Sequence, residues 1–124
     1  MLPGRHRLTS AQDFSAVMGQ RQRAGSATVV ANVQLVSRPE GPRWRCGFIV
    51  SKAVGNAVVR HRTTRRLRHI VAELLTSRKV ELPEDHATDI VIRALAKAPA
   101  ANHATLTADV ESCLRRALTK AGRS

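Results

Sequence analysis

Residues 51–68 read SKAVGNAVVRHRTTRRLR and carry the strongest structural signal in the chain. Gly55 and Asn56 are typical of a tight turn, and the residues that follow predict a long helix over residues 57–78. Successive helical positions lie about 100° apart, which places the apolar side chains on one face. These are Leu67, Ile70, Val71, Leu74 and Leu75. The opposite face carries Arg62, Arg65, Arg66 and His69.

The same stretch is densely basic. Between Lys52 and Arg68 there are six lysine or arginine side chains and no acid. Like charges three or four residues apart destabilise a helix, so the run is best explained by phosphates that neutralise it. We expect Arg60 to project past the edge of a sheet beside Lys52, and the helix start near Asn56 to offer backbone N–H groups to a further phosphate. The plain alternative is a solvated basic helix face.

Charge also distinguishes the whole chain. Its 124 residues have a formal net charge of +12, whereas a small domain needs a net charge of only about 2–8 for solubility. No apolar run approaches the ~18 residues of a membrane span, and the N-terminus lacks the apolar core of a signal peptide, so we expect a cytoplasmic protein. The widely separated Cys46 and Cys113 predict buried small hydrophobes in a reducing compartment, not a zinc or redox site.

The flanking sequence predicts a small mixed fold. A first helix follows Ser10, carries Phe14, Val17 and Met18 on one face and ends at Gly19. Strands are predicted over residues 27–36, 44–51 and 89–95, a last helix over residues 108–120, a basic turn over residues 20–26 and a loose arm over residues 1–8. This order predicts one domain of the α/β class, an α+β sandwich with helices packed on a small sheet.

Groups that could carry out chemistry are sparse. The sequence has no phosphate-binding loop that ends in lysine, no G-x-S-x-G and no H-E-x-x-H. The aspartates form no close pair, which argues against a two-metal nuclease site in the protein. His61 and His69 could act as acid or base groups, but their arginine neighbours favour contacts with phosphates or bases. We therefore expect no catalytic residue and no metal ligand in this chain.

At this point the chain resembles the bacterial ribonuclease P protein component family. Ser51-Lys52, Gly55-Asn56-Ala57-Val58, Arg60, Arg62, Arg65 and Arg68 match the central motif of that family. Met1-Leu2-Pro3, Arg7-Leu8, Asp13-Phe14, Val17 and Asp89-Ile90-Val91 extend the resemblance over nearly the whole chain. The departures are Ala53, His61 and Thr64 in place of a lysine, an asparagine and a basic residue. Leu95 stands where an arginine is common, with Arg93 two residues earlier, and tyrosine is absent.

The resemblance implies an order of helix, three strands, helix, strand, helix around a small mixed sheet, with a left-handed βαβ crossover. It implies that this chain is one subunit of an endoribonuclease that frees the mature 5′ end of tRNA, with the chemistry performed by a catalytic RNA and its Mg²⁺. The implied contacts with that RNA are Lys52, Asn56, Arg60, His61, Arg62, Arg65, Arg66 and Arg68. Phe14 and Met18 would line a cleft for the single-stranded 5′ leader of precursor tRNA. One protein would bind each RNA, the free protein would be a monomer, and no organic cofactor is implied.

Four alternatives stay open at this stage. Phe14, Val17 and Met18 have the spacing of plain core residues, and periodicity alone favours that interpretation. The chain could be a general structured-RNA-binding or ribosome-associated protein that uses the same basic helix. It could instead be a nuclease in its own right that uses His61 or His69. A DNA-binding module is a weaker possibility, because no helix-turn-helix spacing is evident.

Overall fold

The computed structural model describes residues 4–20 and 22–122. Its elements follow the order that the family resemblance implied, with one short turn of 3₁₀ helix added at the start. They are η1 (Gly4–His6), α1 (Ala11–Met18), β1 (Arg23–Gly25), β2 (Val29–Val36), β3 (Trp44–Ile49), α2 (Ala57–Thr76), β4 (Ala87–Ala94) and α3 (His103–Gly122). None of the helices in this part of the chain has the length and apolar character needed to cross a membrane.

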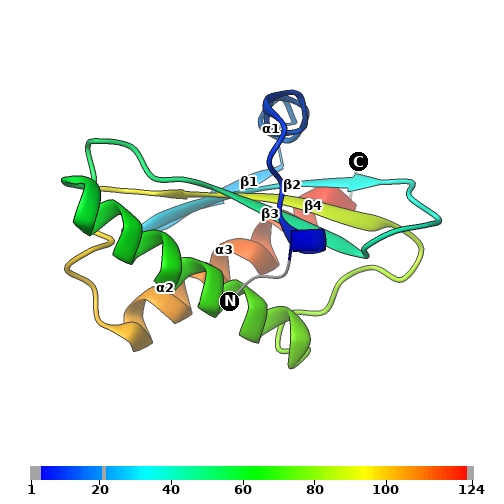
Figure 1. Ribbon diagram of the computed structural model, residues 1–124. Helices are drawn as coiled ribbons and strands as arrows, with labels where there is room; N and C mark the ends of the chain where they lie inside the picture. The colour runs from blue at the N-terminus through cyan, green and yellow to red at the C-terminus, as the bar shows by residue number, and fades with distance from the viewer. Residues whose placement is uncertain (1–3, 21, 123–124) are drawn as a thin grey trace.

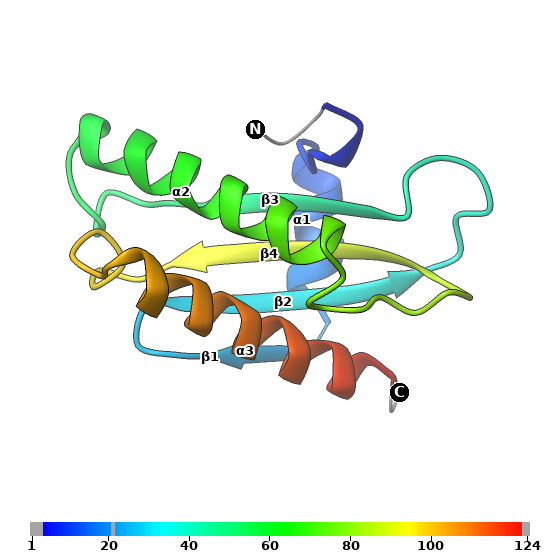
Figure 2. The same ribbon diagram turned by 90° about the horizontal axis from the view of Figure 1, so that it is seen from below.

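The four strands form one mixed sheet in the order β1-β2-β4-β3. β4 is antiparallel to β2 and parallel to β3, and β1 is antiparallel to β2. Helices α2 and α3 cover one face of the sheet and α1 lies on the other (Figure 1). In Figure 2, α2 passes in front of the sheet, β3 and β4 both run to the left, and β4 lies below β3. This path makes the β3–α2–β4 crossover left-handed, as the family resemblance implied.

Most boundaries differ from the sequence-based expectations by one or two residues, and two differences are larger. α3 begins at His103, five residues before the predicted start at 108. Asn102 explains the difference, because its side-chain Oδ1 accepts a hydrogen bond of 2.8 Å from the N–H of Thr105 and so caps the helix. β1 falls within residues 20–26, where a basic turn was expected. A strand of three residues is too short to give a period-two pattern.

The main core lies between the sheet and the pair α2 and α3. All five apolar residues predicted on α2 are buried there, together with alternate residues of β2, β3 and β4. Cys46 and Cys113 are both buried and unpaired, which confirms their prediction as small core residues. Burial raises the pKa of the Cys46 thiol.

A smaller apolar cluster lies under α1 on the other face. Val17 is fully buried with Leu8 and Val91, while Phe14 and Met18 pack around them partly exposed. The ring of Phe14 lies directly on Gly47 of β3, where a Cβ atom would come within 2.2 Å of Phe14 Cζ. The start of α1 is capped as predicted, since the Ser10 hydroxyl accepts a hydrogen bond of 3.3 Å from the N–H of Asp13.

A network of charges ties α1 to the sheet. The carboxylate of Asp89, on β4, is almost fully buried and accepts hydrogen bonds of 3.0 and 2.8 Å from Arg45 on β3. Arg38 donates a third of 3.1 Å to the same carboxylate. Arg45 also reaches Asp13 of α1 at 3.3 Å. Two arginines therefore neutralise one buried acid, and one of them fixes the position of α1.

Residues 4–8 pack against the sheet, in contrast to the loose arm expected for residues 1–8; residues 1–3 lie outside the described part of the chain. The N–H of Leu8 donates to the carbonyl of Cys46 at 3.1 Å, and Leu8 itself is 3% exposed. The ring of His6 stacks on Trp44 at a centroid distance of 3.9 Å. An edge strand needs partners for its outward backbone groups, and this segment supplies them along β3.

Replacing Gly47 by alanine should lower the free energy of unfolding by about 1–3 kcal/mol, because the new methyl group displaces the ring of Phe14 from the sheet. Urea unfolding measures the change. Gly4→Ala is the matched control, since no heavy atom lies within 4 Å of its added Cβ. Equal midpoints for the two variants would contradict the close packing of α1.

Candidate RNA-binding surface

The turn between β3 and α2 depends on a glycine and an asparagine. Gly55 has a φ of +152°, and a Cβ atom there would meet Cγ1 of Val59 at 2.9 Å. The side chain of Asn56 accepts a hydrogen bond of 3.0 Å from the N–H of Val59, which makes Asn56 the helix cap. Its predicted contribution to a phosphate site therefore comes from the helix start that it holds in place. Lys52 is exposed on the same turn.

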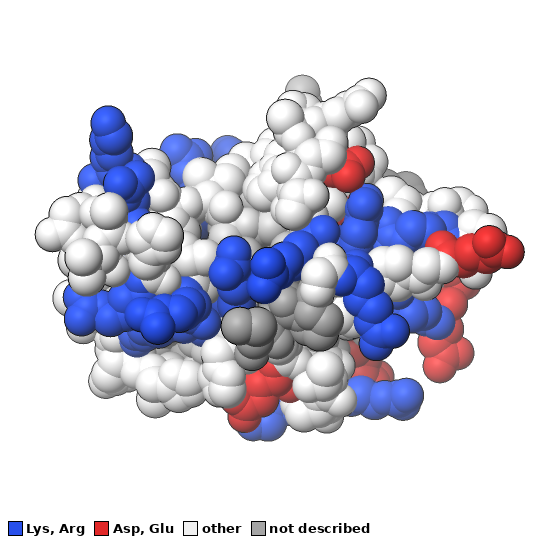
Figure 3. All heavy atoms as spheres, viewed as in Figure 1, with Lys and Arg blue, Asp and Glu red and all other residues white. Residues whose placement is uncertain are grey.

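Three residues at four-residue spacing, Arg60, Thr64 and Arg68, line an open hollow beside Val50 at the end of β3. The hollow has a volume of about 540 Å³ and is completed by His61 and Arg65. The hydroxyl of Thr64 donates a hydrogen bond of 2.9 Å to the carbonyl of Arg60. Figure 3 shows lysine and arginine atoms gathered over this end of α2, on the left of the view, while acidic atoms appear lower down and on the right.

Four arginines near the start of α2 have no partner in the part of the chain that the structure describes. Within residues 4–20 and 22–122, the side chains of Arg60, Arg62, Arg65 and Arg68 form no ion pair and no hydrogen bond. The Nε atoms of Arg60 and Arg68 are nevertheless buried. Burying a donor without an acceptor costs about 1–3 kcal/mol. An acceptor-rich ligand in the hollow, such as a phosphate, would satisfy these groups and neutralise the repulsion between them.

Arg66 behaves differently from its neighbours. Its guanidinium turns towards the loop between β4 and α3 and donates to the carbonyls of Ala98, Pro99 and Ala101 at 3.5, 3.4 and 2.6 Å. It is partly buried. The sequence pattern grouped Arg66 with the outward-facing arginines, but the structure gives it a bracing contact that joins α2 to this loop.

The two histidines of α2 lie in different surroundings. His61 lies beside the hollow and is exposed. His69 pairs with Glu73 one turn later at 3.4 Å, and its ring centroid lies 6.3 Å from that of His103. In the described part of the chain, no three His, Cys, Asp or Glu side chains gather as possible metal ligands.

The face under α1 provides the second predicted surface. α1 runs across the strands (Figure 2), with Phe14 over Gly47. Beside α1, four residues that are paired from strand to strand form a row across the sheet. Each of them is half-buried or exposed. The row consists of Ile49, Arg93, Val30 and Gly25. Arg93 therefore points onto the surface beside α1, while the backbone of Leu95 is held by the carbonyl of Thr28 at 2.8 Å.

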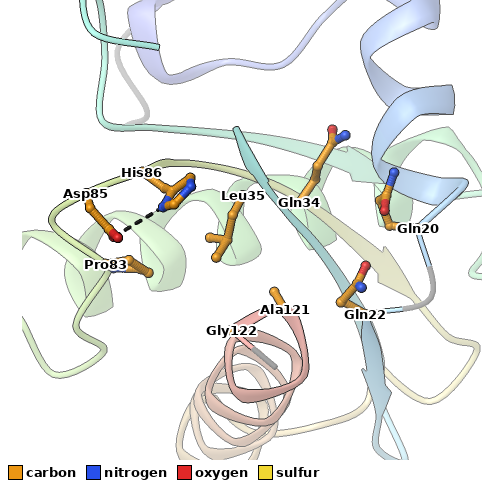
Figure 4. Close-up of a pocket in the computed structure, with 9 residues that line it drawn as sticks. All are labelled: Gln20, Gln22, Gln34, Leu35, Pro83, Asp85, His86, Ala121 and Gly122. Carbon is orange, nitrogen blue, oxygen red and sulfur yellow. Dashed lines mark ion pairs between the residues drawn. The ribbon is translucent and has the colours of Figure 1, made fainter. Parts of the chain in front are cut away.

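A further hollow was not predicted from the sequence. It has a volume of about 440 Å³ and lies where the end of α3 meets the end of β2. Figure 4 shows Gln20, Gln22 and Gln34 on one side of it and an ion pair between Asp85 and His86, of 3.2 Å, on the other. The hydrogen bond from His86 lowers the pKa of Asp85. Glutamines scattered in the sequence give no periodic signal, so this site could not have been found before the fold.

Replacing Arg66 by methionine should lower the free energy of unfolding by about 1–3 kcal/mol, because three carbonyls lose a charged donor. Arg62→Met, which removes an exposed and unpaired arginine, should change it by less than about 0.5 kcal/mol. Thermal and urea unfolding of both variants measure the difference. A stability loss of equal size at the two positions would contradict the bracing contact.

Comparisons with known proteins agree with the geometry. Residues 2–118 match the family model described as Ribonuclease P. The ribonuclease P protein component of Corynebacterium efficiens is 42% identical over 136 aligned positions, covering 99% of this chain and 96% of that protein. The corresponding protein of Mycobacterium sp. (strain KMS) is 42% identical and covers 94% and 93%.

Solved structures show the same fold. The RNase P protein of Staphylococcus aureus superposes with a TM-score of 0.69 at 23% identity, covering 89% of this chain and 93% of that one. The RNase P protein from Thermotoga maritima gives a TM-score of 0.69 at 20% identity, covering 89% and 96%. With the family match over nearly its whole length, this chain belongs to the ribonuclease P protein component family, whose known role is to serve as a subunit of the endoribonuclease that processes the 5′ end of tRNA.

Proposed function

We propose that this chain binds the catalytic RNA of ribonuclease P through the crossover surface, made by Lys52, the start of α2 at Asn56, and Arg60, His61, Arg62, Arg65 and Arg68. The observation that carries the proposal is a set of four arginines that have no partner among the described residues, two of which have buried Nε donors. A guanidinium donates to two phosphate oxygens at once and so fixes a direction as well as a charge. Arg66 is left out of this set, because the loop carbonyls occupy it.

The second part of the proposal concerns the substrate. The 5′ leader of precursor tRNA lies beside α1, on the open row that contains Arg93, with Phe14 and Met18 as its apolar wall. Unpaired bases stack on exposed apolar and aromatic side chains without strong sequence preference. Phe14 and Met18 are suited to this role because they are only partly covered, whereas Val17 on the same helix is fully buried and serves the core.

The protein neutralises RNA phosphates and positions the precursor tRNA. Mg²⁺ held mainly by RNA phosphates supplies the hydrolytic chemistry. The arginines of the crossover surface reduce phosphate repulsion where the RNA folds closely, and the leader cleft selects precursor over mature tRNA. One protein binds one catalytic RNA in the cytoplasm. A general structured-RNA-binding role is the competing function, and it predicts no stimulation of cleavage.

The decisive experiment is cleavage of a precursor tRNA at low magnesium by the protein alone, by a bacterial ribonuclease P RNA alone, and by both together. Cleavage at the mature 5′ end that requires both components supports the proposal. Cleavage by the protein alone would make the chain a nuclease in its own right. An RNA activity that the protein leaves unchanged would reduce the function to RNA binding.

Arg62→Gln should weaken assembly with the catalytic RNA and make the slope of log K against log salt shallower by about one unit, since one phosphate contact is lost. Filter binding between 50 and 400 mM salt, roughly the range over which such contacts are screened, measures both. Arg78→Gln removes the same charge from an exposed position outside the crossover surface and should leave the slope unchanged. Identical slopes for the two variants would remove Arg62 from the RNA interface.

Phe14→Leu should reduce the preference of the holoenzyme for precursor over mature tRNA by about tenfold, the equivalent of one lost base stack. Assembly with the catalytic RNA should stay close to that of the wild type. Phe48→Leu is the matched control, because Phe48 packs on the main core on the opposite sheet face. If both variants, or neither, shift the preference for leader-bearing substrate, Phe14 does not line the leader site.

A further inference from the structure

The outer edge of β1 has an unusual set of hydrogen-bonding groups. In β1 the residues that bond to β2 alternate with residues whose backbone points outward. The carbonyl of Gln22 accepts from Val33, at 3.0 Å, and the N–H of Ser26 donates to the carbonyl of Val29, at 2.9 Å. Ala24 lies between them, opposite Ala31. The backbone groups of Arg23 and Gly25 must therefore point away from the sheet.

Side chains of α3 already occupy the two outward carbonyls. Arg116 donates to the carbonyl of Gly25 at 2.7 Å, and Lys120 donates to the carbonyl of Arg23 at 2.7 Å. The outward N–H groups of Arg23 and Gly25 donate to no residue in the described ranges. The edge thus presents donors and positive charge, with its acceptors covered.

This combination selects the kind of partner. A strand added from another protein needs both donors and acceptors along the edge, and here the acceptors are taken. A phosphodiester offers only acceptor oxygens and carries a negative charge, so it matches an edge of N–H groups beside cations. The adjoining open hollow, of about 530 Å³, is lined by Arg23, Arg116 and Lys120 and by no acid.

The position of this edge identifies which nucleic acid would reach it. Gly25 is the last member of the in-register row that starts at Ile49 and passes Arg93 and Val30. The row lies beside α1 on the face assigned to the leader. Three spacings between neighbouring strands take it about 14 Å from β3 to β1. A single strand that enters beside Phe14 and follows the row therefore ends at the β1 edge.

We propose that the outer edge of β1 binds phosphates of the 5′ leader upstream of the nucleotides that lie beside α1. The N–H of Gly25 and the guanidinium of Arg23 contact the leader directly. Arg116 and Lys120 keep the outward carbonyls of β1 hydrogen-bonded, so that only N–H donors remain available at this edge. The inference rests on the leader cleft of the proposed function and extends it by a second contact on the opposite edge of the sheet from the crossover surface.

The test uses reconstituted holoenzyme and precursor tRNAs with leaders of increasing length. Gly25→Pro removes the outward N–H without removing a bond to β2, and proline is tolerated at such edge positions. Gly25→Ala is its matched control, since the added Cβ makes only an ordinary contact of 3.5 Å with Val30. Arg23→Gln tests the side chain independently of backbone changes, with Lys79→Gln, an exposed position in the turn after α2, as the control for net charge.

We expect Gly25→Pro and Arg23→Gln to lower affinity for long-leader substrate by about three- to tenfold, as for one charged hydrogen bond. Short-leader precursor and mature tRNA should bind as they do to wild-type holoenzyme, and the control variants should lose less than about twofold. A long-leader affinity that falls no further than in the controls overturns the inference. So does an equal loss for mature tRNA.

Two further outcomes separate this inference from the proposed function. If the affinity of wild-type holoenzyme for substrate does not rise with leader length, both the proposed leader cleft and the proposed β1 contact are overturned. If Arg23→Gln weakens assembly with the catalytic RNA in the absence of substrate, the edge contacts that RNA, and the assignment to the leader is overturned while the crossover surface stands.

Discussion

The parallel pairing of β3 with β4 determines most of the architecture. Two parallel neighbours cannot be joined by a hairpin, so the chain must leave the sheet and return over one face. α2 makes that connection, and its direction leaves the turn around Gly55 and the first part of the helix at the end of the sheet. The positive φ of Gly55 and the cap at Asn56 are local requirements of this path. The crossover surface lies on this first part of α2, beside Val50 at the end of β3.

Two sets of arginines have different physical roles. Arg38, Arg45, Arg66 and Arg116 donate to carboxylates or carbonyls within the fold. Arg60, Arg62, Arg65 and Arg68 have no such partners among the described residues. The second group has neither an acid nor a carbonyl acceptor beside it, and the repulsion between its charges destabilises a compact state until a polyanion neutralises it. Part of the net charge of +12 therefore lies on the surface proposed to meet RNA.

Sequence patterns predicted the long elements and failed on the short ones. The 3.6-residue period located α2 and its five core residues, and capping chemistry located the start of α1. β1 and residues 4–8 were misjudged because their order comes from tertiary contacts, with β2 and α3 in one case and with β3 in the other. The bracing contact of Arg66 was not predicted for a related reason. Its angle on the helix points outward, but the loop between β4 and α3 lies within reach of its long side chain, and no local pattern reveals that loop.

The two predicted binding surfaces differ in how far their residues can be located from the sequence alone. The crossover residues are close together in sequence, so helical spacing alone brings Arg60, Arg62, Arg65 and Arg68 onto one surface. The predicted leader site beside α1 depends on the meeting of α1 with three strands, and its residues come from distant parts of the chain. Phe14 was expected there only from the family resemblance. The row that continues to Gly25 becomes visible once the strand register is known.

The strand order also has a consequence for synthesis. β4 lies in the middle of the sheet, between β2 and β3, yet it is the last strand to leave the ribosome. Until it arrives, β2 and β3 have no common neighbour, and the apolar face of α2 has only part of its core to cover it. Formation of the sheet must wait for residues beyond α2, which raises the share of distant contacts and slows folding. The nascent chain therefore exposes its most basic segment before it has a completed sheet.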